Sequence, residues 1–243
     1  MIDFHCHLDL YHEPMKVFAE VQKKRDFVLA VTTSPKAYQK TSYYFKGTDT
    51  VKVALGFHPE LVAQRSVEIA LFFELIHRCK YLGEIGIDGS PRAKSSLLEQ
   101  KRFFREAVIN ANLCGGRIMS IHSRYAVRDV LDILEGFSGQ SKPVLHWFTG
   151  TKTDVLRAVS IGCWFSINPN MCYTQSGREN LGCIPLDKLL PETDAPFTQI
   201  DGKPYMPWNT SVTTFLAHLY GMQYDDMSKQ LQKNLYDLIG SML

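Results

Sequence analysis

The sequence lacks the features that mark several classes of protein. It has no apolar run long enough to span a membrane, and Met1 leads directly into strand-like residues rather than into a secretion signal. None of its six cysteines forms a CxxC pair, so we expect buried thiols rather than a disulfide framework. No Ser/Pro-rich or low-complexity tract divides the chain. We therefore expect one cytoplasmic domain over residues 1–243, with no membrane partner.

A strong charge of either sign is also missing. The 27 basic and 25 acidic side chains leave a formal net charge of +2. Such a balance neither indicates nor excludes nucleic-acid binding, because a local basic groove can lie within a near-neutral total. With 45% hydrophobic and 21% charged residues, the chain can bury a sizeable core.

Short apolar, often β-branched runs alternate with segments of helical period along the whole chain. The expected strands cover 2–4, 26–33, 51–57, 81–87, 117–123, 142–148, 162–168 and 188–194. The clearest helical segments cover 66–78, with Val67 on the apolar face, 95–113, 126–137 and 151–162. Eight strands alternating with helices predict an α/β fold of the (β/α)₈ TIM-barrel type. An open doubly wound sheet is compatible with the same alternation, although no glycine fingerprint for a dinucleotide follows an early strand.

Polar residues gather where these strands end, which is the functional face of a barrel. In "HCH", His5 and His7 share one face of the first strand because side chains alternate, and Cys6 points to the other face. Any one of these histidines could be a hydrogen-bonded core residue. Burying all of them without ligands would cost several kcal/mol, so together they predict a ligand site. The strand-end groups are His5, His7, His58, Glu84, Asp88, His122, His146 and Asp194, whereas His12, His77 and His218 lie elsewhere.

These groups are more numerous than a single tetrahedral zinc requires. Four of the imidazoles and two of the carboxylates would suit a two-metal site with a bridging carboxylate, an arrangement that clamps the attacking and the leaving oxygen of a phosphoester displacement. Glu84 is central in chain order and is the natural bridge. We expect two divalent ions, either Zn²⁺, Mn²⁺ or Mg²⁺.

The ordered motifs "HCH", "GFHP", "GEIGID", "HSR", "HWFTG" and "TDAP" resemble those of the TatD-type metal-dependent hydrolases, a branch of the amidohydrolase superfamily. The resemblance implies that one metal is held by His5, His7, Glu84 and Asp194, and the other by Glu84, His122 and His146. It implies catalytic roles for Glu84 and for Asp194, which would orient or deprotonate the attacking water. His58, Asp88 and Arg124 match positions near the substrate pocket. Family members resemble one another in being DNases, often 3′ exonucleases, and some remove D-amino acids from tRNA.

The chain departs from the family pattern in two places. Gly89 and Ser90 follow Asp88 where aromatic residues are usual, and 196–211, "PFTQIDGKPYMPWNTS", replaces an Arg-Asn-x-Pro segment. These departures put the exact substrate in question but not the metal site. They resemble the TatD-like component of the Qat anti-phage defence system, which implies defence-system partner proteins.

We expect a DNase that acts on DNA, with Arg124 as a phosphate partner and Trp147 as a stacking surface for a base. Phe148 and Phe197 are further aromatic candidates, although both residues also fit a core. A shallow basic rim is expected from Lys36, Arg92, Arg124, Lys152, Arg178 and Lys203. One alternative is a metal-dependent ester or amide hydrolase such as an aminoacyl-tRNA deacylase, and another is a non-catalytic subunit stabilised by metal. A carboxylated-lysine amidohydrolase is disfavoured because Glu84 occupies the bridging position.

Overall fold

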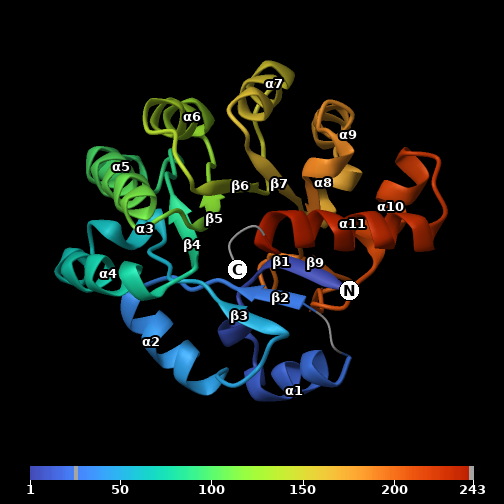
Figure 1. Ribbon diagram of the computed structural model, residues 1–243, viewed down its shortest axis with the longest axis horizontal. Helices are drawn as coiled ribbons and strands as arrows, with labels where there is room; N and C mark the ends of the chain where they lie inside the picture. Colours follow the sequence, from blue (N-terminus) through green and yellow to red (C-terminus); the bar gives the residue numbers. More distant parts are fainter. Residues whose placement is uncertain (25–26, 241–243) are drawn as a thin grey trace.

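The computed structural model describes residues 1–24 and 27–240. Its central feature is a ring of parallel strands with helices on the outside (Figure 1). The strands are β1 (Ile2–Cys6), β2 (Phe27–Ala30), β3 (Val51–Val53), β4 (Tyr81–Gly86), β5 (Ile118–His122), β6 (Lys142–His146), β7 (Trp164–Ile167) and β8 (Leu189–Pro191). The α/β barrel expected from the alternation of strands and helices is confirmed.

The ring closes through two junctions between strand ladders. One ladder runs β1-β2-β3 and the other runs β4-β5-β6-β7-β8. At the first junction Leu55, just beyond β3, pairs in parallel with Leu82 of β4. At the second, the backbone N–H of Asp194 donates to the carbonyl of His5, over 2.8 Å, and His7 donates to Ala195, over 2.9 Å. Both hydrogen bonds of the second junction involve residues of the expected site, so closing the barrel also assembles that site.

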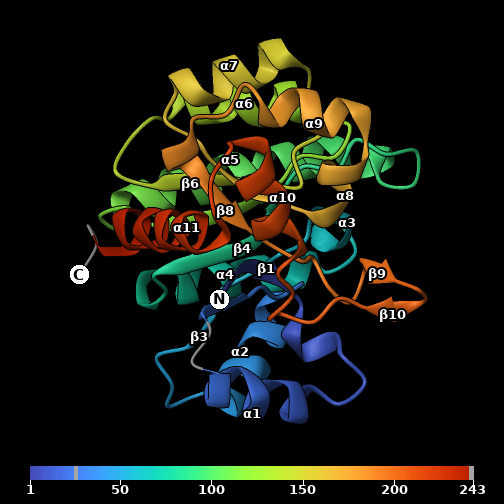
Figure 2. The ribbon, with the colours of Figure 1, turned by 90° about the vertical axis from the view of Figure 1, so that its right-hand side faces the viewer.

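The helices form the outer layer of the barrel (Figure 1). They are α1 (Pro14–Lys24), α2 (Pro35–Tyr44), α3 (Pro59–Val62), α4 (Ile69–Leu75), α5 (Leu97–Leu113), α6 (Val127–Gly136), α7 (Lys152–Ser160), α8 (Pro169–Tyr173), α9 (Gln175–Leu181), α10 (Ser211–Leu219) and α11 (Tyr224–Ile239). A hairpin of β9 (Gln199–Ile200) and β10 (Lys203–Pro204) projects at one end, opposite the end where α11 finishes (Figure 2). Among the described helices, none has the length and apolar character needed to cross a bilayer.

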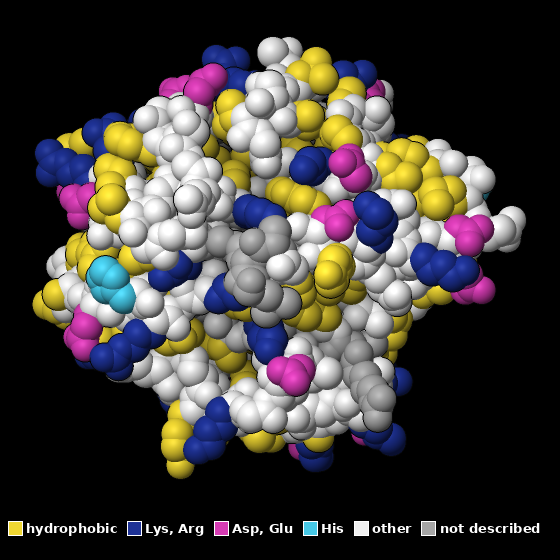
Figure 3. Space-filling model, in the orientation of Figure 1, with side chains coloured by type: hydrophobic (Ala, Val, Ile, Leu, Met, Phe, Trp, Pro, Cys, Tyr) yellow, Lys and Arg dark blue, Asp and Glu magenta, His cyan; other side chains and the backbone are white. Residues whose placement is uncertain are grey.

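The barrel interior is filled by apolar side chains from every strand except β3, together with one from α11. This buried cluster consists of Phe4, Leu29, Val31, Ala54, Tyr81, Ile118, Val144, Trp164, Leu190 and Leu238. Figure 3 shows lysine and arginine side chains around the middle of the face on which α11 lies. The last carbonyls of α11 accept hydrogen bonds from two lysines, since Lys80 Nζ donates to Ile239 and Lys142 Nζ to Leu238. The C-terminal end of a helix dipole is negative and attracts cations, so these lysines hold α11 across this end of the barrel.

Several local expectations were wrong, and the expected strands 26–33 and 188–194 end early, at Ala30 and Pro191. The third strand ends at Val53 rather than at residue 57, because the chain turns from the β2 ladder toward Leu82 of β4. The expected helix 66–78 is only α4, flanked by 3₁₀ turns, and Val67 is 85% exposed. Glu68 is buried instead, since its carboxylate accepts the backbone N–H of Lys36 in the first turn of α2. The start of the expected strand 26–33 falls partly outside the described residues. All six cysteines are free thiols, but Cys114 and Cys183 are only partly buried, contrary to the expectation of buried thiols.

Candidate active site

The first part of the site comes from β1 and the residue that follows it. His5 and His7 are both fully buried, with ring centroids 5.3 Å apart. Cys6 between them lies on the other side of the strand, where its thiol is 3.8 Å from the carbonyl of Ala195. The two imidazoles therefore project together, as the alternation of side chains along a strand predicts.

Glu84 on β4 lies at the centre of the cluster, and its two carboxylate oxygens face different histidines. Oε2 lies 3.2 Å from Nε2 of His7 and 3.7 Å from Nε2 of His5. Oε1 lies 2.6 Å from Nδ1 of His122 on β5 and 3.1 Å from Nε2 of His146 on β6. One buried carboxylate thus faces four imidazoles, two from each oxygen, and the rings of His5 and His146 stack on each other at a centroid distance of 3.8 Å.

Asp194 follows β8 and completes the side of the cluster formed by His5 and His7. Its Oδ1 lies 3.6 Å from Nε2 of each of these histidines. The residue has a φ of +54°, a left-handed conformation that is costly for a non-glycine residue and recurs at functional sites. Its backbone N–H bond to His5 holds that conformation in place.

His58 also reaches the cluster. Its Nε2 lies 3.5 Å from Oε1 of Glu84, and its ring meets that of His122 edge-on at 5.0 Å. Its Nδ1 accepts the N–H of Glu60 at the start of α3, so helix capping fixes the orientation of the ring. The structure thus places His58 beside the expected metal ligands and at the edge of the cleft.

Three buried partners hold the histidines from behind. Glu192 at the end of β8 contacts Nδ1 of His146 at 3.3 Å, and Ser120 contacts Nδ1 of His5 at 2.7 Å. Asp88 lies 2.9 Å from Nε2 of His122. Such partners fix the tautomer and direction of a ligating ring.

Two of these partners, Glu192 and Ser120, were not anticipated from the sequence. Ser120 lies two residues before His122 on β5 and shares its face of the strand, so the alternation that pairs His5 with His7 could have found it. Glu192 lies just beyond β8, which ends at Pro191, and strand alternation gives no such signal there.

Two effects set the pKa values in the cluster. Burial favours the uncharged form of each group, and neighbouring groups of opposite charge favour the charged form. Burial raises the pKa of Asp194 to about 7. Burial lowers the pKa of His58 to about 4, although Glu84 opposes the shift. Despite the opposite effect of burial, Glu192 and Glu84 raise the pKa of His146. Burial alone would raise the pKa of Glu84, but the nearby histidines, of which His58 has the largest effect, hold this pKa well below its usual range.

The donor set fits divalent metal ions. Among the described residues, Nε2 of His5 and Nδ1 of His7 are buried without a hydrogen-bond partner, so ring nitrogens are left available. Potential ligand atoms converge in three groups, which are His5/His7/Glu84, His58/Glu84/His122 and His5/His146/Glu192. Imidazole and carboxylate are the ligands that zinc and manganese accept in proteins. The chain therefore carries candidate metal-binding clusters at the ends of its strands.

A cleft of about 640 Å³ opens onto this cluster. Its outer walls include Arg92, Arg124, Trp147 and the exposed Phe197, whose ring meets His7 edge-on at 5.0 Å. Phe148 is buried and lies away from the cleft.

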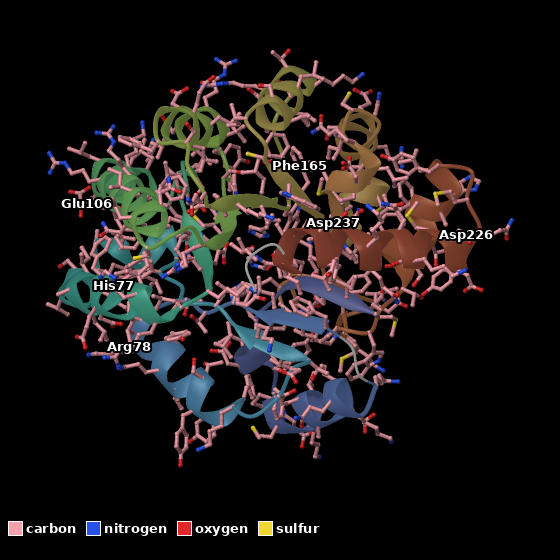
Figure 4. The ribbon with its side chains drawn as sticks, viewed as in Figure 1. His77, Arg78, Glu106, Phe165, Asp226 and Asp237 are labelled. Carbon is pink, nitrogen blue, oxygen red and sulfur yellow. The ribbon has the colours of Figure 1, made fainter. Side chains whose placement is uncertain are left out.

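The other expected pocket residues are placed differently. Asp88 is buried behind His122, where it also accepts the backbone N–H of Ser90. It is not among the described residues that line the cleft. Of the expected basic rim, Arg92 and Arg124 line the cleft, whereas Lys36, Lys152, Arg178 and Lys203 are not among its described lining residues. His77, which the sequence left without a role, lies at the outer edge of the molecule (Figure 4).

Known proteins resemble this chain over almost its whole length. A family model described as "TatD related DNase" matches residues 2–240. Human deoxyribonuclease TATDN3 is 26% identical over 98% of this chain and 94% of its own length. The uncharacterized metal-dependent hydrolase YcfH of Escherichia coli is 26% identical over 96% of this chain and 93% of its own.

Solved structures agree on the fold. The crystal structure of YJJV, a TatD homologue from Escherichia coli, superposes with a TM-score of 0.88 at 22% identity, covering 99% of this chain and 98% of that one. A dihydroorotase from Campylobacter jejuni superposes with a TM-score of 0.63 at 11% identity over 98% of this chain and 82% of its own. The barrel, the metal-ligand clusters and the nearly complete match of the family model lead to one conclusion: the chain belongs to the TatD-related DNase family of metal-dependent hydrolases.

Proposed function

We propose that this protein is a two-metal phosphodiesterase that cleaves DNA, working as a 3′ exonuclease. The observation that carries the proposal is the position of Glu84, whose two carboxylate oxygens face separate sets of imidazoles. A carboxylate shared in this way suits a pair of divalent ions.

The proposed ligands divide around Glu84. His5, His7, Glu84 and Asp194 would hold one ion, and Glu84, His122 and His146 would hold the other. Zn²⁺ and Mn²⁺ suit the nitrogen-rich set, and Mg²⁺ would depend more on the carboxylates. When bound, the two ions would activate water and offset the charge that develops on the phosphate.

The chain's own residues supply the proton transfer and the positioning. We assign Asp194 as the general base that accepts the proton of the attacking water at its carboxylate. Glu84 would take part in the reaction as the ligand that both ions share. Glu192 and Asp88 are positioning residues, because each contacts the far ring nitrogen of a proposed ligand histidine.

The cleft would receive the phosphodiester end of DNA. Arg124 would contact a phosphate, His58 would lie beside the reacting group, and Trp147 would stack on a base. Human TATDN3 is named a deoxyribonuclease, and the matching family model is described as a DNase, which supports DNA as the substrate class. The chain would act as a single barrel domain in the cytoplasm, and its place in anti-phage defence with partner proteins rests on the sequence resemblance alone.

The deciding experiment compares substrates on one metal-loaded preparation. A single-stranded oligonucleotide labelled at its 5′ end should be shortened stepwise from its 3′ end, and a chelator should abolish the reaction. Hydrolysis of aminoacyl-tRNA or of a small ester, with no cleavage of DNA, would reject the nuclease and favour the carbonyl-hydrolase alternative. A protein that binds metal but cleaves none of these substrates would favour the non-catalytic alternative.

A further inference from the structure

A second cavity adjoins the proposed active cleft. It has a volume of about 680 Å³ and lies between the loops that follow β5 and β6. Arg124 and Thr149 line both cavities, so the two lie side by side. A chain whose end occupies the cleft could therefore extend into this second cavity, which we term the side groove.

The side groove carries two uncommitted positive charges. Among the described residues, Arg128 has no carboxylate partner, and Arg124 contacts only the ring of Tyr125, at 5.6 Å. The two acidic residues in the lining are already engaged. Asp129 pairs with Lys101 at 2.6 Å, and Asp154 accepts the N–H of Thr151 at 2.9 Å in a helix capping box. Asp154 keeps its negative charge in that box, so the lining residues together with Lys101 carry a net charge of +1.

Tyr125, which follows Arg124, contributes an exposed aromatic ring to the lining of the side groove. Tyr125 is 73% exposed and has a φ of +53°, so the chain keeps a bulky side chain in a costly backbone conformation. The backbone N–H of Gly89 donates to the carbonyl of Arg124 over 2.8 Å and pins this turn. A Cβ on Gly89 would lie 2.4 Å from the carbonyl oxygen of Tyr125, so only glycine permits that approach. The ring is thus presented to solvent by a turn fixed from behind.

We propose that Tyr125 and Arg128 form a subsite for the nucleotide next to the one at the proposed metal centre, with Tyr125 stacking on its base and Arg128 binding its phosphate. An exposed ring that shares the lining of one groove with two guanidinium groups suits the alternation of base and phosphate along a single strand. Paired bases in a duplex present no free face, so the subsite selects single-stranded DNA. The inference rests on the proposed function and adds that the DNA substrate is single-stranded rather than duplex.

The test measures binding separately from cleavage. Metal-loaded protein with Asp194→Asn, which holds the substrate uncut, is titrated with a fluorescent single-stranded six-nucleotide DNA, and binding is followed by anisotropy. Adding Tyr125→Ala should raise Kd about 5-fold or more, and adding Arg128→Gln should raise it and flatten its salt dependence. Tyr125→Phe, which keeps the stacking face, should bind like the parent.

Matched controls lie far from the groove. Tyr236→Ala removes another exposed tyrosine, 70% exposed on α11, and Arg78→Gln removes an arginine at the outer edge of the molecule (Figure 4). Neither should change Kd. On otherwise wild-type protein, hydrolysis of bis(p-nitrophenyl) phosphate, which is too small to reach the groove, should keep its kcat and KM in both groove variants.

The outcomes separate this inference from the proposed function. Unchanged DNA binding by Tyr125→Ala, or an equal loss for duplex and single-stranded DNA, would overturn the subsite even if the enzyme proves to be a nuclease. Loss of bis(p-nitrophenyl) phosphate hydrolysis in parallel with DNA binding would also overturn it, by indicating a general structural defect. Tyr125-dependent binding of single strands by a wild-type protein that cleaves no DNA would support the subsite and reject the nuclease.

Discussion

Oε1 of Glu192 lies 3.3 Å from Nδ1 of His146, while Nε2 of the same ring lies 3.1 Å from Oε1 of Glu84. A buried imidazole is therefore held between two buried carboxylates. If Glu84 and His146 bind the same metal, the carboxylate of Glu192 accepts a hydrogen bond from Nδ1 of His146. The proton then stays on Nδ1, and Nε2 is free to ligate the metal. This relationship leads to the first prediction.

Glu192→Gln should weaken metal binding without removing any proposed ligand. The amide lacks the negative charge that makes the imidazole a better donor, and losses of this kind are typically about 10- to 100-fold in affinity. Titration against a competing chelator measures the change. The control is Glu179→Gln, on the exposed surface of α9, where the carboxylate contacts Lys152 at 3.7 Å. Equal affinity in both variants would show that Glu192 does not tune His146.

Metal uptake by the metal-free protein should tighten as the pH rises from about 6 to 8. Nearby carboxylates raise the pKa values of His7, His122 and His146 against the effect of burial, and burial raises that of Asp194 to about 7. Protons therefore occupy the proposed ligands at the acidic end of this range and must leave when a metal binds. Calorimetry in buffers of different ionisation enthalpy counts the released protons, and no release at pH 6 would contradict this picture.

Asp194→Asn should remove most turnover while the protein still binds metal. An amide cannot accept the proton from water, and loss of a general base typically costs about 10²- to 10⁴-fold in kcat. Parallel assays of DNA cleavage and metal content separate the two effects, since His122 and His146 lie on the other side of Glu84. Wild-type kcat in this variant would remove Asp194 from the mechanism.

DNA cleavage should fall steeply with added salt, and Arg124→Ala should raise KM without loss of metal. Each phosphate contact displaces condensed counterions, so the slope of log kcat/KM against log salt reports the number of contacts and should become shallower in the variant. Arg78→Gln, outside both cavities, is the matched control. A slope near zero for the wild-type enzyme would argue against a polyanionic substrate.

Local patterns in the sequence predicted most of the fold and the centre of the site. Each strand and its crossover helix is a local unit, so the alternation of eight strands with helices, together with the lack of a dinucleotide fingerprint, favoured the barrel over an open sheet. The two-residue period placed His5 beside His7. The early end of β3 and the exposure of Val67 were missed because they depend on contacts with β4 and α2 that lie far away in the chain.

The surroundings of the site were less predictable, for a similar reason. Asp88 was expected in the substrate pocket, but its place behind His122 is fixed by hydrogen bonds across 34 residues of sequence. The side groove depends on the left-handed backbone of Tyr125 and on the close approach of Gly89, and no spacing rule indicates either feature. DNA specificity and the defence role rest on motifs, because the geometry of a hydrolytic metal site alone suits several substrates.

The central claim, that Glu84 joins two metal ions, is tested most directly by counting metals in wild-type protein and in Glu84→Gln. Elemental analysis of protein saturated with zinc or manganese and then desalted should give two ions per chain for the wild type. The shared ligand is lost from both sites at once in Glu84→Gln, so its content should fall well below one. A wild-type value that stays at one per chain at saturation, or a Glu84→Gln protein that retains two, would contradict the account.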